Sequence, residues 1–141
     1  MTYSIQIPCN KHNLKKVRSF VEDILGNYYI SASDINLIVL AIDEMCANLI
    51  IHSHKCNAEE HIELKIKDEN GKFVFEIHES SPECFNLVDY KLPEMKQLIS
   101  EKRNGGIGLI LVRKIMDDIQ LERRGSYNIY RLVKAVARTN C

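Results

Sequence analysis

The stretch Ala41-Ile-Asp-Glu-Met-Cys-Ala-Asn-Leu-Ile-Ile-His52 carries polar side chains on what reads as a buried helix. Glu44, Asn48 and His52 recur at four-residue steps, and positions i and i+4 lie about 40° apart around an α-helix, so the three form one stripe. Apolar residues flank this stripe on the side away from the core: Leu37, Leu40, Ala41 and Ile51. The pattern predicts a partly enclosed pocket in which Glu44 acts as a base and Asn48 offers a hard oxygen ligand to Mg²⁺.

The same polar residues also have a purely structural interpretation. Glu44 and Asn48 would then hydrogen-bond to neighbouring loops, as polar residues at helix edges often do. His52 lies near the helix end, where a histidine commonly caps the last carbonyl groups. The helix alone therefore leaves both interpretations open.

Periodicity places this helix among further helices and strands. Residues 31–52 form the helix itself, opened by a capping box at Ser31 and Asp34, and an earlier helix is expected over 10–28. Asn70-Gly71 predicts a tight hairpin turn, because both residues tolerate positive φ. Alternating apolar residues predict five strands, at residues 4–8, 61–67, 72–78, 119–123 and 127–136.

A glycine cluster opens the last helix, after a long connection. The segment 80–104 far exceeds the roughly 12–15 residues beyond which unstructured loops become uncommon, which indicates a functional role. It leads into Gly105, Gly106 and Gly108, where free amides and the helix dipole favour an anion such as phosphate. An ordinary glycine hinge is the alternative, because the cluster matches neither a Walker loop nor a GxGxxG motif.

Composition limits the class of protein. The 141 residues carry nineteen Lys+Arg against nineteen Asp+Glu, and 45% are hydrophobic. These values predict one globular domain spanning residues 1–141, with no membrane segment and no direct binding to nucleic acid. Five scattered cysteines without metal-ligand spacing, and no signal peptide at the start, predict a cytoplasmic location.

Taken in order, these features resemble the ATP-binding domain of the GHKL superfamily, and within it the small anti-sigma-factor serine/threonine protein kinases. The stretch 41–52 resembles the family's N box, and Gly105-Gly-Ile-Gly-Leu-Ile-Leu-Val-Arg-Lys-Ile-Met-Asp117 resembles its second glycine box. The resemblance implies the GHKL (Bergerat) ATP-binding fold. This is an α+β, two-layer α/β sandwich with a mixed, mainly antiparallel sheet covered on one face by helices.

The resemblance also implies roles for individual residues. ATP and Mg²⁺ would bind between the helix and an ATP lid at 80–104, with Glu44 as the general base and Asn48 as a cofactor-binding residue and Mg²⁺ ligand. The first glycine box is usually Asp-x-Gly and is Glu79-Ser80-Ser81 here. As cofactor-binding residues, Glu79 would take the position of the Asp that binds the adenine amino group, and Ser81 that of the Gly that allows the nucleotide to approach closely. The phosphate cradle corresponds to Gly105, Gly106, Ile107, Gly108 and Leu109.

The implied function is an anti-sigma factor that transfers the γ-phosphate of ATP to a Ser or Thr of an anti-sigma antagonist protein. A homodimer would hold the sigma factor on another surface. Because Glu79 and Ser81 depart from the family pattern, the alternative is a degenerate regulator that sequesters a protein without ATP turnover. A sensor histidine kinase would need a helix pair bearing a phosphoacceptor histidine, for which the residues before Ser31 leave no room.

Overall fold

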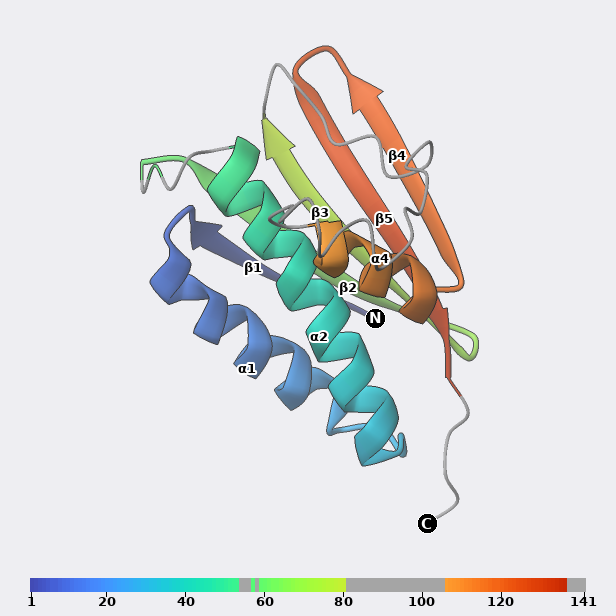
Figure 1. The fold of residues 1–141 in the computed structure, drawn as a ribbon. Coiled ribbons are helices and arrows are strands. Elements are labelled where there is room, and N and C mark those ends of the chain that lie inside the picture. The colour runs from blue at the N-terminus through green and yellow to red at the C-terminus, as the bar shows by residue number, and fades with distance from the viewer. Residues whose placement is uncertain (54–56, 58, 81–105, 137–141) are drawn as a thin grey trace.

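The computed structural model describes residues 1–53, 57, 59–80 and 106–136, and within them five strands form one sheet with helices on one face (Figure 1). The strand order is β1-β2-β3-β5-β4, and every described pair is antiparallel. The sequence predicted a mixed, mainly antiparallel sheet, and in the described residues the sheet is entirely antiparallel. The α+β sandwich itself is confirmed. The elements are β1 (Thr2–Pro8), η1 (Lys11–Asn13), α1 (Leu14–Leu25), α2 (Ala32–Asn48), η2 (Leu49–Ser53), β2 (His61–Glu69), β3 (Lys72–Ser80), α4 (Gly106–Ile115), β4 (Asp118–Arg124) and β5 (Tyr127–Ala135).

The β2–β3 hairpin follows directly from its turn residues. Asn70 has φ 48° and Gly71 has φ 85°, the left-handed values that a two-residue turn requires. Glu69 pairs with Lys72, which sets the register of both strands. The apolar positions of β2 and β3 therefore point to the same face, towards the helices.

Helix α2 begins as predicted and ends earlier than predicted. The hydroxyl of Ser31 accepts a hydrogen bond from the backbone N–H of Asp34 at 3.2 Å, which caps the helix. At Asn48 the α-helix gives way to the π-helical turn η2, so the expected regular helix over 31–52 is not continuous. π-Helical turns are rare and occur often at functional sites.

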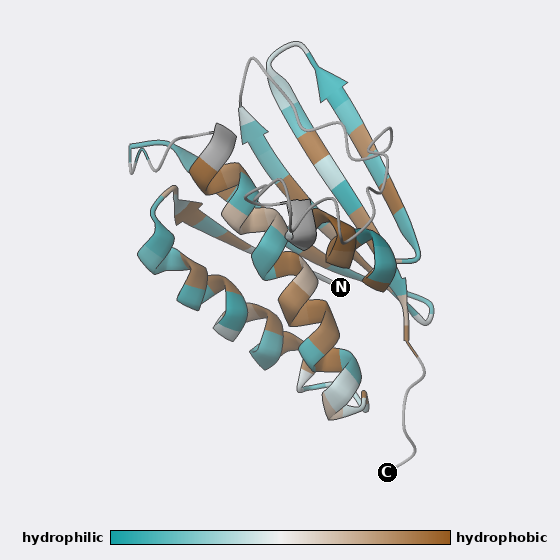
Figure 2. Cartoon of the chain, viewed as in Figure 1, coloured by the Kyte–Doolittle hydropathy of each residue, from teal (hydrophilic) through white to brown (hydrophobic). Residues whose placement is uncertain are grey.

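The hydrophobic core lies between the sheet and α2. This helix packs against both α1 and α4, and Figure 2 shows mostly hydrophobic residues along it, whereas α1 alternates between the two kinds. Ile38, Ile42, Met45 and Leu49 are fully buried against the sheet, as the predicted core stripe requires. Within the described residues, no helix has the length and apolar character needed to span a membrane.

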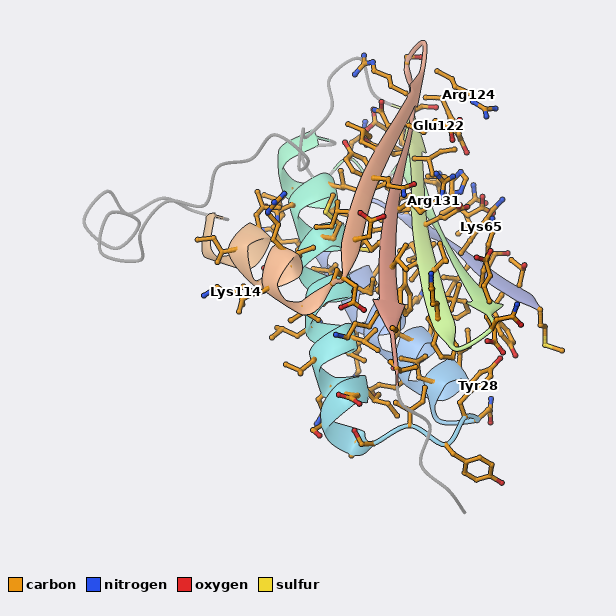
Figure 3. The ribbon with its side chains drawn as sticks, turned by 90° about the vertical axis from the view of Figure 1, so that its right-hand side faces the viewer. Tyr28, Lys65, Lys114, Glu122, Arg124 and Arg131 are labelled. Atoms are coloured by element: carbon orange, nitrogen blue, oxygen red, sulfur yellow. The ribbon has the colours of Figure 1, made fainter. Side chains whose placement is uncertain are left out.

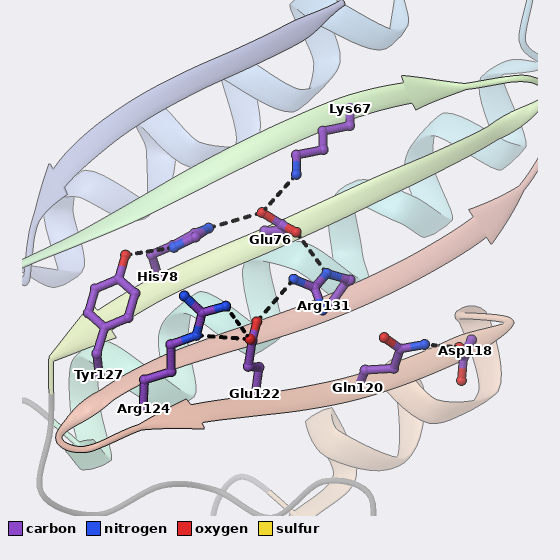
Figure 4. A network of polar contacts seen from close by, with 9 residues as sticks. All are labelled: Lys67, Glu76, His78, Asp118, Gln120, Glu122, Arg124, Tyr127 and Arg131. Carbon is purple, nitrogen blue, oxygen red and sulfur yellow. Dashed lines mark hydrogen bonds and ion pairs between the residues drawn. The ribbon is translucent and has the colours of Figure 1, made fainter.

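The other face of the sheet carries a polar network that sequence patterns did not reveal. Figure 3 shows Lys65 and Arg131 projecting from the side of the sheet opposite α2. At the centre of this face, Glu76 is only 4% exposed (Figure 4). Its carboxylate accepts hydrogen bonds from Arg131 Nε at 2.7 Å and His78 Nε2 at 3.0 Å, and lies 3.3 Å from Lys67 Nζ.

The buried carboxylate of Glu76 should make the free energy of unfolding depend on pH. Burial alone raises the pKa of Glu76, but hydrogen bonds from Arg131, His78 and Lys67 outweigh it and lower the pKa from 4.5 to about 2. The folded pKa lies below the unfolded one, so the carboxylate stabilises the fold above about pH 4.5, and this is lost as the pH falls towards 2. Glu76→Gln should therefore lower the free energy of unfolding by about 2 kcal/mol at pH 7 and flatten its fall in acid.

Urea unfolding at pH 7, 4 and 3 measures this effect. Glu122→Gln is the matched control. Glu122 is more exposed and lies on β4, which β5 separates from β3, so this change should barely move the urea midpoint at pH 7. An unchanged midpoint in Glu76→Gln would show that the network contributes nothing to stability.

Candidate functional site

Glu44 and Gly108, from the two motifs that the sequence singled out, meet where α4 packs on α2. A Cβ added at Gly108 would overlap Oε2 of Glu44 and lie 3.1 Å from its Cδ. Figure 1 shows α4 beside α2, and these two helices pack against each other. The glycine therefore lets the backbone of α4 approach the carboxylate with no side chain between them.

The surroundings of Glu44 favour a base. Partial burial raises the pKa of this carboxyl, and the negative charge of Asp43 adds to the effect. Asp43 itself turns to α1, where its Oδ1 lies 3.0 Å from Nη1 of Arg18. A carboxylate whose proton affinity is raised while it stays partly accessible is suited to accept a proton.

Asn48 closes α2 with a hydrogen bond to its own helix. Its Nδ2 donates to the backbone carbonyl of Glu44 at 2.8 Å, and the side chain is 5% exposed. Because the amide nitrogen is used in this way, the oxygen Oδ1 is the atom that can face a cation. Within the described residues, no three His, Cys, Asp or Glu side chains gather closely enough to hold a metal.

Glu79 lies on the inner face of the sheet, not at its rim. It follows Phe73, Phe75 and Ile77 in the alternation of β3 and is 2% exposed. Its Oε1 accepts hydrogen bonds from Asn128 Nδ2 at 3.2 Å and from Tyr130 Oη at 3.1 Å. Both partners were missed from the sequence, although an Asn and a Tyr at inward positions of a strand were a usable signal.

The remaining predicted site residues divide into three groups. Gly106 and Ile107 begin α4, as the motif suggested. Leu109 is 6% exposed and belongs to the core, so it can reach a ligand only through its backbone. Ser81, Gly105, the proposed lid beyond Ser80 and the side chain of His52 lie outside the described residues.

The apolar residues that were expected to enclose Glu44 differ in their exposure to solvent. Ala41 is fully buried, whereas Leu37 and Leu40 are exposed by 46% and 37%. The leucines therefore form an open surface on the N-terminal half of α2, and they do not enclose a pocket.

Residues 7–134 match the family model of the histidine kinase-like ATPase domain. The chain belongs to this family. The match spans both motifs and the strands β2, β3 and β4 in full, together with the last two residues of β1 and all of β5 but its final residue. None of the proteins with curated descriptions matches the sequence.

Solved structures share the fold at low sequence identity. The RsbU and RsbW domains of Rv1364c from Mycobacterium tuberculosis match 99% of this chain with a TM-score of 0.69 at 14% identity, and the match spans 33% of that longer chain. A protein chain in the SiaB–SiaC complex from Pseudomonas aeruginosa matches 96% of this chain with a TM-score of 0.64 at 14% identity, spanning 88% of its own length. The catalytic domain of the histidine kinase ThkA matches 97% with a TM-score of 0.54 at 13% identity, spanning 99% of its length.

Proposed function

We propose that this histidine kinase-like ATPase domain is a protein kinase that transfers the γ-phosphate of ATP to a Ser or Thr of an antagonist protein. The approach of Gly108 to the Glu44 carboxylate carries this proposal, because it joins a base to the beginning of a helix that can bind phosphate. The Glu44 carboxylate would accept the proton of the attacking hydroxyl group.

The residues present fit ATP and Mg²⁺. Helix α4 begins with Gly106 and has no acidic residue in its first turn, so its free N–H groups are compatible with an anion. The Asn48 oxygen is a hard ligand, and proteins usually bind Mg²⁺ through one or two such groups together with phosphate oxygens. ATP supplies the phosphoryl group, while Asn48 and the amides of α4 would hold the phosphates in position for it.

The protein partners are proposed on similarity. One similar structure contains an RsbW domain, and another is a complex of SiaB with a second protein, SiaC. With the sequence resemblance, these support an antagonist protein as phosphorylation substrate, and a homodimer that binds a sigma factor. The proposed location is the cytoplasm.

Titration with ATP, with Mg²⁺ and with EDTA, tests the nucleotide site. The parent protein should bind ATP more tightly when Mg²⁺ is present, and Asn48→Ala should lose most of that gain, about tenfold in Kd, because it removes the proposed ligand. Asn36→Ala changes the same residue type at an exposed position of the same helix and should keep the full gain.

No binding at millimolar ATP would overturn the kinase proposal. It would favour a regulator that sequesters its partner without nucleotide turnover. If Mg²⁺ strengthens ATP binding equally in Asn48→Ala and the parent, Asn48 is not a ligand of the metal.

A further inference from the structure

Two exposed leucines lie on α2 where neither the helix nor the core requires an apolar side chain. Leu37 and Leu40 are exposed by 46% and 37%, and they are two of the five large hydrophobic side chains that the described residues expose. Glutamine or lysine would form the helix almost as well, so helix propensity does not explain these leucines. Their apolar surface stabilises a structure only when another molecule covers it. We call Leu37 and Leu40 the leucine pair.

The leucine pair is continuous with the Glu44 carboxylate. Leu40 and Leu37 precede Glu44 by four and seven positions, and residues at these spacings share one face of an α-helix. Because each residue adds about 1.5 Å to the length of a helix, they lie about 6 Å and about 10 Å from Glu44 along the axis of α2. A protein segment that brings a hydroxyl group to Glu44 and extends towards the beginning of α2 therefore passes over both leucines.

The neighbouring helix α4 adds a positive charge to the side of the molecule that the helices cover. Figure 3 shows Lys114 projecting from α4 away from the sheet, and α4 packs against α2. Lys114 is exposed and forms no ion pair with any described residue. An acidic side chain in a segment bound beside Glu44 would complement this charge.

We propose that the leucine pair docks the acceptor segment of the protein substrate. This segment carries apolar side chains two and three residues from the phosphorylated Ser or Thr, and an acidic residue that faces Lys114. The spacing follows because an extended chain advances about 3.3 Å per residue, so that about 6 Å and about 10 Å correspond to two and three residues.

The inference rests on the proposed kinase function, because it names what the same site recognises. In the transfer step the acceptor oxygen forms a bond to the γ-phosphorus of ATP, and the bond from that phosphorus to ADP breaks. ADP leaves with the electron pair, and Glu44 takes the proton of the hydroxyl group. The leucine pair takes no part in this chemistry and acts only on how the acceptor is held.

Two synthetic peptides with one central serine test this recognition. One carries leucine at the second and third positions on both sides of the serine, the other carries glutamine there, and both have a glutamate at each end. The measured quantity is kcat/KM for transfer of labelled phosphate from MgATP. The parent should favour the leucine peptide on the order of tenfold, because docking buries apolar surface on both molecules.

The double variant Leu37→Gln with Leu40→Gln should bring the two peptides to within about twofold, by raising KM for the leucine peptide. Its Kd for MgATP and its kcat should match those of the parent, whereas a purely structural role would lower kcat for both peptides and the melting temperature. Each single substitution should remove part of the preference. Tyr29→Gln is the matched control, because it removes a side chain that is 58% exposed between α1 and α2, and it should keep the preference.

Lys114→Gln tests the acidic part of the proposal. It should raise KM for both peptides about threefold at low salt, and added salt should reduce this difference from the parent, because exposed charges are screened. Unchanged KM values would show that no acidic residue of the segment faces Lys114.

The results that overturn the inference differ from the one that overturns the proposed function. If the parent binds MgATP but phosphorylates both peptides equally or neither of them, or if the double variant keeps the preference, the leucine pair does not dock the acceptor, and the nucleotide site stands. If the double variant converts a dimer of the parent into a monomer, a second copy of the chain covers the leucines instead. A parent that does not bind MgATP refutes the proposed function itself, and the inference with it.

Discussion

Glu44→Gln should lower the rate of phosphoryl transfer by about a thousandfold while ATP binding changes little. The amide keeps the shape of the side chain but cannot accept the proton of the attacking group, and general base catalysis contributes about 10²–10⁴ in rate. Transfer of labelled phosphate to the protein partner, once captured from cell extract, measures the first quantity. Single-turnover phosphate release from MgATP gives a second readout without that partner.

Asp43→Asn is the matched control for Glu44→Gln. It removes the neighbouring carboxylate of the same helix, which pairs with Arg18 of α1. Loss of this negative charge lowers the raised pKa of Glu44, so transfer at neutral pH should stay within about threefold of the parent. In the parent, transfer should fall as the pH drops through the raised pKa of Glu44, because only the ionised form accepts a proton. Comparable transfer by Glu44→Gln and the parent would refute the base role.

Gly108→Ala should abolish most activity without unfolding the protein. The added methyl group overlaps Oε2 of Glu44 and forces that side chain into another rotamer. A displacement of about 1 Å at a reacting group costs on the order of a hundredfold in rate. Alanine is favoured over glycine within helices by up to about 1 kcal/mol, which offsets the cost of moving a flexible side chain.

A double variant separates this steric effect from a general disturbance of α4. In a Glu44→Ala background the space beside Gly108 is open, so adding Gly108→Ala should not lower the residual phosphate release further. Thermal melting should place Gly108→Ala within a few degrees of the parent. A large fall in melting temperature would mean that the methyl group disturbs the helix packing, not the carboxylate alone.

Local sequence patterns predicted the helices, strands and turns, because each of these elements depends on residues that are close together in the chain. The Ser31 cap, the turn at Asn70-Gly71 and the alternation of β2 and β3 all act within a few positions along the chain. The end of α2 was less predictable. The apolar periodicity of the sequence continues past Asn48, and it does not show that the α-helix changes to a π-helical turn there.

The candidate site was predicted as residue types and not as an arrangement. Glu44 and Gly108 were both named from their motifs, but their contact depends on how α4 crosses α2. Asn128 and Tyr130 were missed because their importance depends on which strand lies beside β3. The Glu76 network was missed for the same reason, since Lys67 and Arg131 come from two different neighbouring strands.

The sequence by itself determined the fold class, the family and the two motifs, because periodicity, capping and turn residues act over short distances along the chain. Only the tertiary structure decided that Gly108 lies against the Glu44 carboxylate, and that Tyr130 and Asn128 hold Glu79. These contacts join residues far apart in the chain. Strand register and helix packing create them, and both depend on burying the whole core at once.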